Sequence, residues 1–148
     1  MKLSEERVIA ATPETVWAGI LDAEVLKECI PGCQELTGNP DDGFEAVVVQ
    51  KVGPVKATFK GAVSLSDIVP GKSCRLSGQG KGGAAGFAKG GATVRLAPEG
   101  EGTRLSYDVD ASVGGKLAQL GSRIIESFSK KLADRFFTRF QEVMENRA

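Results

Sequence analysis

The sequence predicts one α+β domain in which a single antiparallel sheet carries its helices on one face. Three observations lead to this prediction. Apolar and polar residues alternate with a period of two in several segments between residues 43 and 112, which is typical of strands with one buried and one solvated face. Apolar residues step by three or four from Leu117 to Val143, which indicates one long C-terminal helix. The chain has 148 residues, enough for one domain with its own core.

The N-terminal part predicts one strand and two short helices. We expect the strand over residues 2–11. Thr12 is a good N-cap, and Pro13 suits the first helical position. A backbone N–H at that position would have no partner within the helix, so its absence in proline costs nothing. Asp22 can cap a second helix, AEVLKEC, which Pro31 ends because proline cannot continue the hydrogen-bond ladder.

About six antiparallel strands are expected after these helices, separated by turn signals such as NPDDG and GP. Five of them can be placed, over residues 43–52, 55–65, 73–81, 85–97 and 103–112. The long helix follows and would extend roughly 45 Å if it has about 30 residues, so it should lie along the whole sheet. Its apolar stripe comprises Leu117, Leu120, Ile124, Phe128, Leu132, Phe136, Phe140 and Val143.

Composition excludes several classes of function. With 41% apolar and 26% charged residues, the chain is typical of a soluble globular protein. The N-terminal MKLSEERV has no apolar signal region, so we expect a cytoplasmic protein. There is no histidine, which removes the commonest general base and the commonest metal ligand. We therefore predict no catalytic triad and no metal site.

Charge is unevenly distributed along the chain. Residues 1–50 hold three Lys/Arg and ten Asp/Glu, a net charge of −7, while the whole chain sums to zero. A zero sum argues against general affinity for nucleic acid. The asymmetry either orients the molecule toward a partner or an anionic surface, or reflects solvated charge without a further role.

The glycine-rich run from Gly78 contains GQGKGG, which matches the dinucleotide pattern G-x-G-x-x-G. That pattern needs a helix immediately after the glycines to receive the pyrophosphate. Here the run leads into GGATVRL, which alternates as a strand does, and no GK[ST] follows. The motif therefore does not predict nucleotide binding.

Alternation gives these glycines another role. Leu76, Gly78 and Gly80 share one face of their strand, and Gly90 and Ala92 share a face of the next strand. Glycine inside a strand marks a bend or the close approach of another group. Two interpretations remain open: the glycines allow a strongly curved sheet, or they leave an apolar pocket beneath the long helix.

The cysteines and paired carboxylates do not predict a reactive site. Cys29 and Cys33 flank a Pro-Gly break, and Cys74 is the only other thiol. A structural zinc site needs four ligands, so buried, reduced thiols are the better interpretation. Asp108 and Asp110 belong to the polar face of their strand, where solvated charge is the default.

Several segments together carry a resemblance to a known family. They are ATPETVW, LDAEVLKECIPGCQEL, GPVKATFKGAVSLSDI, the glycine-rich strand, and VGGKLAQLGSRIIESFSKKLADRFFTRF. Over nearly the whole chain the sequence resembles the carbon monoxide dehydrogenase G-subunit family, a branch of the START and Bet v 1-like helix-grip superfamily. The resemblance implies a single helix-grip domain over residues 1–148: seven antiparallel strands around a long C-terminal helix, with two short helices after the first strand.

The resemblance also implies a function. Members are associated with molybdenum-containing carbon monoxide dehydrogenases, are thought to recruit the enzyme to the membrane, and are thought to bind a hydrophobic ligand such as a quinone. We therefore expect a non-enzymatic accessory protein with no tightly bound cofactor, in the cytoplasm or peripheral at the inner face of the membrane. Two alternatives remain: an enzyme of the cyclase or hydrolase type using the same cavity, or a docking factor without a ligand.

The cavity walls can be assigned from the alternation and the helical stripe. Tyr107 would offer its hydroxyl to a ligand carbonyl. The complete expected lining is Trp17, Val55, Phe59, Leu76, Gly78, Gly80, Phe87, Gly90, Leu105, Tyr107, Leu117, Leu120, Ile124 and Phe128.

Overall fold

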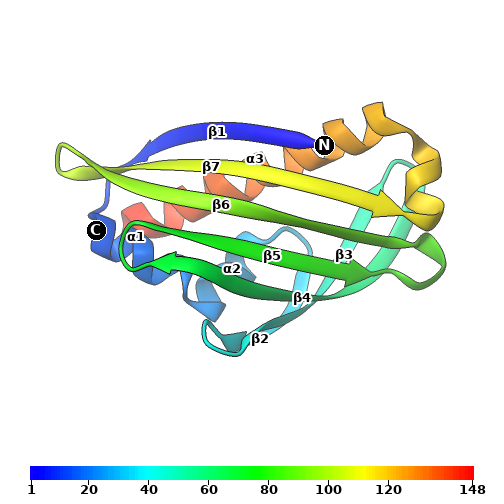
Figure 1. Cartoon of the computed structure of the whole chain (residues 1–148), viewed down its shortest axis with the longest axis horizontal. Helices are drawn as coiled ribbons and strands as arrows, with labels where there is room; N and C mark the ends of the chain where they lie inside the picture. Colours follow the sequence, from blue (N-terminus) through cyan, green and yellow to red (C-terminus); the bar gives the residue numbers. More distant parts are fainter.

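Seven antiparallel strands form one sheet in the order β1-β7-β6-β5-β4-β3-β2 (Figure 1). The structure is a computed structural model that describes all residues from Met1 to Ala148. The predicted seven-stranded sheet is confirmed. Its strands are β1 (Lys2–Ile9), β2 (Cys33–Asn39), β3 (Gly43–Val52), β4 (Val55–Val69), β5 (Ser73–Lys81), β6 (Phe87–Glu99) and β7 (Gly102–Gly114).

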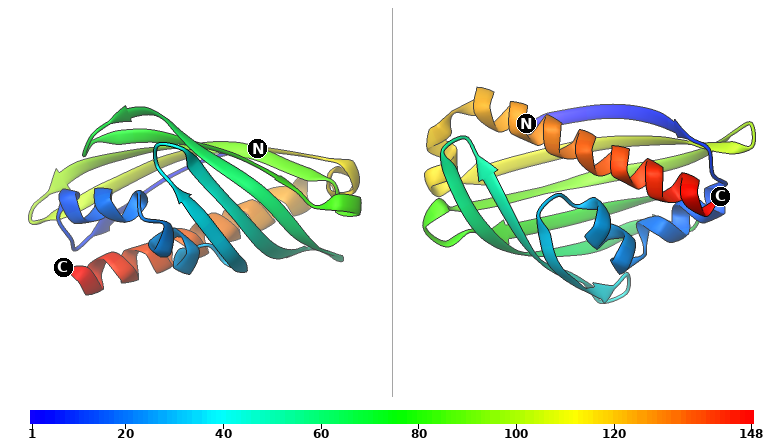
Figure 2. Two further views of the ribbon diagram at one scale, coloured as in Figure 1. Left: turned by 90° about the horizontal axis from the view of Figure 1, so that it is seen from below. Right: turned by 180° about the vertical axis from the view of Figure 1, so that it is seen from behind.

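The three α-helices lie on one face of this sheet, which we call the inner face (Figures 1 and 2). The longest helix, α3, has 26 residues and runs across the inner face, while the two short helices cover the sheet beside its C-terminal end (Figure 2). Two short 3₁₀ helices lie near the opposite end of α3. The helices are α1 (Pro13–Ile20), α2 (Ala23–Cys29), η1 (Gly83–Ala85), η2 (Gly115–Leu120) and α3 (Ser122–Arg147).

The two short helices begin as the sequence predicts. The Thr12 hydroxyl accepts a hydrogen bond from the Thr15 amide at 3.3 Å, with Pro13 in the first turn. The Asp22 carboxylate accepts one from the Glu24 amide at 2.9 Å. Each cap satisfies an amide that has no partner within its helix.

Several element boundaries differ from the prediction. The first strand ends at Ile9 and not at residue 11, and Gly83–Ala85 forms η1, so the strand expected from residue 85 begins at Phe87. The expected long helix is divided, because Gly121 has φ +91°, a conformation that interrupts an α-helix. Leu117 and Leu120 therefore belong to η2 and not to the helical stripe.

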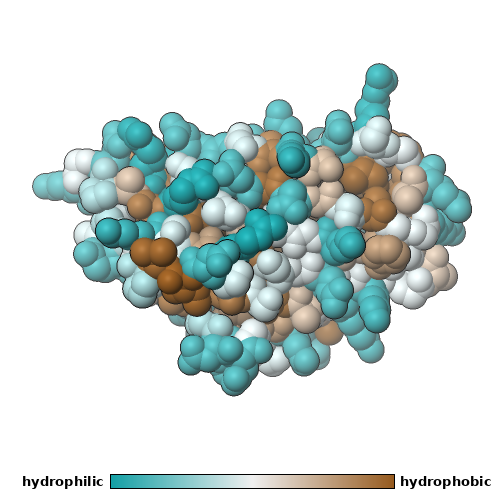
Figure 3. All heavy atoms as spheres, in the orientation of Figure 1, coloured by the Kyte–Doolittle hydropathy of each residue, from teal (hydrophilic) through white to brown (hydrophobic).

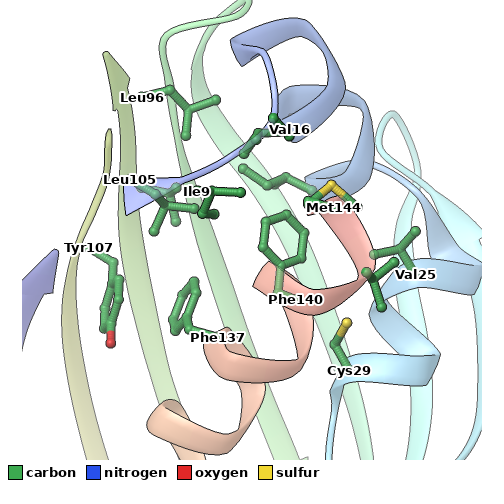
Figure 4. Close-up of a cluster of buried hydrophobic side chains, with 14 of the residues drawn as sticks. Ile9, Val16, Val25, Cys29, Leu96, Leu105, Tyr107, Phe137, Phe140 and Met144 are labelled. Carbon is green, nitrogen blue, oxygen red and sulfur yellow. The ribbon is translucent and has the colours of Figure 1, made fainter. Parts of the chain in front are cut away.

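The larger part of the core lies where the C-terminal half of α3 meets α1, α2 and the sheet. Fifteen buried residues form one cluster there. Phe137 of α3 lies beside the sheet residue Tyr107, and Phe140 points toward Ile9 and Met144 (Figure 4). The rings of Tyr107 and Phe137 stack with their centroids 3.8 Å apart. Met144 has no exposed surface and packs against Gly19, where a Cβ would overlap its sulfur.

A second, much smaller cluster lies near the N-terminal end of α3. It contains three buried residues, Val52, Leu117 and Ile125, with Phe59 and Phe128 among its half-buried neighbours. The core is thus divided into a larger and a smaller cluster, and the centre of the inner face lies between them.

Polar contacts hold the C-terminal half of α3 against the edge strand β1. The Gln141 side-chain amide donates to the Val8 carbonyl oxygen at 3.1 Å. The Ala10 amide donates to the Glu145 carboxylate at 2.8 Å. These contacts occupy backbone groups that an edge strand would otherwise leave free to pair with another chain.

Candidate functional site

The centre of the inner face is rich in glycine and alanine, with Val63 and Val109 as larger neighbours in the same cross-strand rows. Strand register brings these residues together: Gly61 pairs with Gly80, Gly78 with Gly90, and Gly90 with Ala111. None of them is fully buried. We call this group the small-residue floor; it consists of Ala46, Gly61, Gly78, Gly80, Ala88, Gly90, Ala92 and Ala111.

The part of α3 between the two clusters is also incompletely covered. Phe128, Leu132 and Phe136 are half-buried, whereas Phe140 is 1% exposed. Leu132 is the residue of the predicted stripe midway between the clusters. Sheet and helix therefore bury each other less completely in the middle than at either end. Apolar surface left uncovered inside a fold is the kind that a hydrophobic ligand can bury.

The glycines of the floor serve both of the roles left open by the sequence. A Cβ on Gly90 would overlap the Asp110 carbonyl oxygen, and one on Gly61 would lie 2.9 Å from the Gln79 carbonyl oxygen. At these two positions the absent side chain permits close approach of neighbouring strands. Gly80 is different, because the nearest atom to its Cβ would be the Phe59 Cβ at 3.7 Å. That is ordinary contact, so Gly80 leaves room that a side chain could occupy.

The expected wall residues divide between the two ends of the inner face. Leu105 and Tyr107 are buried in the larger cluster, and Trp17 and Leu76 border it. The others belong to the smaller cluster or border it: Val55, Phe59, Leu117, Leu120 and Phe128.

Two expected wall residues lie elsewhere. Phe87 is 46% exposed and alternates with Ala88 of the floor, so it belongs to the outer face, where its ring covers Gly114. Assigning it to the inner face was wrong by one residue, which reverses the face in a strand. Ile124 is 42% exposed and lies against Gly53 in the β3–β4 turn.

A polar cluster next to Tyr107 was not expected. The Tyr107 hydroxyl donates a hydrogen bond to Glu5 Oε2 at 2.8 Å. Burial raises the pKa of the Tyr107 hydroxyl to about 12, and Glu5 adds to this shift. The hydroxyl that we expected to face a ligand is thus already engaged by the protein. Because its pKa moves away from neutrality, Tyr107 is not an activated acid or base.

Arg7 completes this cluster from the same strand. Its guanidinium lies 3.6 Å from the Asp134 carboxylate and donates to the Thr138 hydroxyl at 3.4 Å. It also lies 5.9 Å from the centre of the Phe137 ring, and its buried Nε has no partner. In the structure the odd residues from Leu3 to Ile9 face inward, but no pattern in the sequence indicated Glu5 and Arg7, because charged residues occupy both faces of β1.

The cysteines are free. Burial, followed by the nearby Glu28 carboxylate, raises the pKa of the Cys29 thiol to about 11. Burial also raises the pKa values of Cys33 and Cys74. A protonated thiol is a poor nucleophile and a poor metal ligand. No three Cys, Asp or Glu side chains lie close enough together to hold a metal ion.

The outer face of the sheet carries a polar groove of 810 Å³ that crosses several strands, and three floor residues, Gly78, Gly90 and Ala111, also belong to its lining. Figure 3 shows this side of the molecule as hydrophilic and pale surface interrupted by several hydrophobic patches. Arg75 pairs with Asp110 at 2.9 Å along the groove. Hydrogen bonds from Ser4 and Arg95 lower the pKa of Asp108 on this face. With five hydrophobic residues among twenty, the groove does not resemble the apolar pocket expected from the sequence.

This architecture defines a class of protein, the START-like helix-grip fold, in which an antiparallel sheet holds a long C-terminal helix. A START superfamily protein from Mycobacterium smegmatis has a TM-score of 0.72 at 16% identity, and each chain covers 99% of the other. The profile of the G subunit of carbon monoxide dehydrogenase (CoxG) matches residues 5–145. The chain therefore belongs to the CoxG family.

Other solved structures are similar over almost the full length. A conserved protein from Geobacillus kaustophilus has 29% identity and a TM-score of 0.90, with 99% of this chain and 96% of that chain covered. A protein from Thermus thermophilus has 18% identity and a TM-score of 0.72, with 100% and 99% covered. No curated protein matches the sequence. None of the helices combines the length and apolar character needed to cross a membrane.

Proposed function

We propose that this CoxG-family protein is a non-enzymatic accessory protein that binds a quinone or another hydrophobic lipid between α3 and the small-residue floor. In this proposal it serves a molybdenum-containing carbon monoxide dehydrogenase-type enzyme and links that enzyme to the inner face of the membrane. It holds no tightly bound cofactor, and electron transfer belongs to the partner enzyme.

The single observation that carries the proposal is the small-residue floor between the two core clusters. Residues such as Gly80 and Ala88 contribute little side-chain volume, and Leu132, midway along α3 between the two clusters, is half-buried. A flat apolar ring or a lipid chain could occupy this space. Affinity would come from burial of apolar area, at roughly 25 cal/mol per Å² before the cost of association.

The titratable groups of the inner face favour binding over catalysis. An enzyme of the cyclase or hydrolase type would need an acid or base with a pKa near neutrality. Tyr107 and Cys29 have pKa values of about 12 and about 11. Charged groups near them are engaged as well: Glu5 with Tyr107, Arg7 with Asp134 of α3, and Glu28 with Arg139.

Replacement of Gly80 tests the proposal. In a Gly80→Leu variant the Cβ meets only ordinary contacts and the side chain projects over the floor, and urea unfolding checks that the variant is folded. We expect its affinity for a short-chain menaquinone analogue to fall by at least about tenfold, or 1.4 kcal/mol. Trp17, the one tryptophan of the chain, reports binding by fluorescence, and native mass spectrometry reports it independently.

The matched control is Gln79→Leu, one residue away on the exposed outer face of the same strand. It should retain wild-type affinity. If both variants bind the analogue with the same affinity as the wild type, the proposal that the ligand binds at the floor is wrong. If the wild type binds no quinone and no lipid by either method, the protein is instead a docking factor without a ligand.

A further inference from the structure

One end of the molecule concentrates basic residues. The β3–β4 turn, η1, η2 and the start of α3 meet there, as Gly53 lies against Ile124 and η1 contacts η2. No Asp or Glu occurs in residues 46–66, 68–98 or 111–125. We call this region the basic end and define it by Lys51, Lys56, Lys60, Lys81, Lys116 and Arg123, all of which are exposed.

The cations of the basic end form no ion pair within the protein, although Glu35 and Glu45 line the same hollow as Lys60 and Lys81. All seven ion pairs use other cations, namely Arg7, Arg75, Arg95, Arg104, Arg139 and Arg147. In the first turns of α3, Glu126 is the one acidic residue. Uncompensated charge of one sign at one end creates a field that attracts an anionic surface.

Exposed apolar side chains accompany these cations. Phe87 and Ile124, 46% and 42% exposed, are two of the five exposed large hydrophobic residues. Phe87 pairs with Lys81 across β5 and β6, and Ile124 follows Arg123 directly. Cations surrounding exposed apolar groups are typical of surfaces that rest on a membrane, where the apolar groups enter the interface.

The opposite end of the molecule carries the acidic excess. Glu14 and Glu24, which form no ion pair, lie on α1 and α2, the helices that cover the C-terminal end of α3 (Figure 2). Their charges would be repelled by the anionic surface that attracts the basic end. The separation of charge along the molecule therefore selects one orientation.

We propose that the basic end docks on the anionic phospholipid headgroups of a membrane. Five of its six cations are lysines, which act as mobile point charges and suit a fluid headgroup layer more than the fixed, bidentate recognition for which arginine is used. Docking in this way turns the smaller core cluster, and not the larger one, toward the lipid. The inference rests on the proposed function, in which the protein exchanges a hydrophobic ligand at the membrane.

Vesicle flotation of the full chain tests the proposal. The wild type should bind vesicles containing phosphatidylglycerol, should not bind vesicles of phosphatidylcholine alone, and should be released by salt. A variant with Lys56→Glu, Lys81→Glu and Lys116→Glu should lose at least about tenfold in apparent affinity. The matched control carries Lys2→Glu, Lys27→Glu and Lys72→Glu, which changes the net charge equally at exposed positions elsewhere, and should float nearly as the wild type does.

Ligand binding in solution separates this proposal from the proposed function. Both triple variants should bind the menaquinone analogue with wild-type affinity, measured through Trp17 fluorescence. Loss of flotation in the basic-end variant alone supports docking whether or not a ligand binds. Equal loss in both variants, no flotation of the wild type, or preference for an RNA oligonucleotide over anionic vesicles would overturn it.

Discussion

The hydroxyl of Tyr107 donates its hydrogen bond to Glu5 Oε2 at 2.8 Å, while its ring stacks on Phe137 of α3. This contact joins β7 to the edge strand β1 beneath the C-terminal half of the helix. It makes Tyr107 part of the scaffold and not of the ligand site.

Tyr107→Phe should therefore reduce stability and leave ligand binding intact. Loss of the hydroxyl removes the hydrogen bond to the half-buried Glu5 carboxylate, at a cost of about 1–3 kcal/mol. Urea unfolding measures the cost, and titration with the menaquinone analogue measures affinity. Unchanged stability together with lost affinity would identify the hydroxyl as a ligand contact.

Stability should fall at alkaline pH. Burial raises the pKa of the Cys29 thiol from 9.0 to about 11 and that of Tyr107 from 10.0 to about 12. Both groups hold their protons to higher pH when folded, so their contribution is complete below about pH 9 and is lost as the pH rises through these two values.

Between the ordinary and the raised pKa of each group, its deprotonation should lower the free energy of unfolding by up to about 1.4 kcal/mol per pH unit. Urea unfolding in reducing buffer from pH 8 upward measures this slope. Cys29→Ala should have a smaller slope between about pH 9 and 11. A variant with the wild-type slope would show that Cys29 is not responsible.

Two glycines of the floor should respond oppositely to alanine. Gly90→Ala forces a Cβ against the Asp110 carbonyl oxygen and should destabilise by about 1–3 kcal/mol. Gly80→Ala has room and should stabilise by about 0.5 kcal/mol, because alanine loses less backbone entropy than glycine in a strand. Urea unfolding of both variants tests the distinction, and similar destabilisation by both would remove the argument that Gly80 leaves space.

The middle of α3 should tolerate truncation better than its C-terminal half. Met144→Ala removes a side chain with no exposed surface and should cost about 2–5 kcal/mol. Leu132 is half-buried above the floor, so Leu132→Ala should cost about 1 kcal/mol. The two side chains are similar in size, and equal costs in urea unfolding would indicate that sheet and helix are tightly packed throughout.

Much of the fold could be predicted because period and capping are local properties. The bounds of β3 and β5 follow directly from their alternation, and those of α1 follow from Thr12 and Pro13. Strand β2 was not placed, because CQELTGN lacks clear alternation and its pairing with β3 is irregular after Cys33. The break before α3 depends on the backbone of Gly121, and the spacing of Leu117 and Leu120 fits a 3₁₀ turn as well as an α-helix.

The glycines of the floor could likewise be predicted from the alternation, but the polar cluster of Glu5 and Arg7 beside Tyr107 could not. In KLSEERVI charged residues occupy both faces of β1, so no hydrophobic contrast identifies Glu5 and Arg7 as inward-facing. Their partners on β7 and α3 are 102 and 131 residues away in sequence. Such pairings arise from tertiary structure, which local pattern does not encode.

The most direct test of the central claim is an NMR titration of the ¹⁵N-labelled protein with the menaquinone analogue. We predict that the largest amide shift changes occur at Gly80, Ala88 and Ala92 on the floor and at Leu132 in the middle of α3, with small changes at Lys89 and Ser112 in the outer groove. Changes centred on the outer groove, or none at saturating ligand, would contradict a ligand site between α3 and the floor.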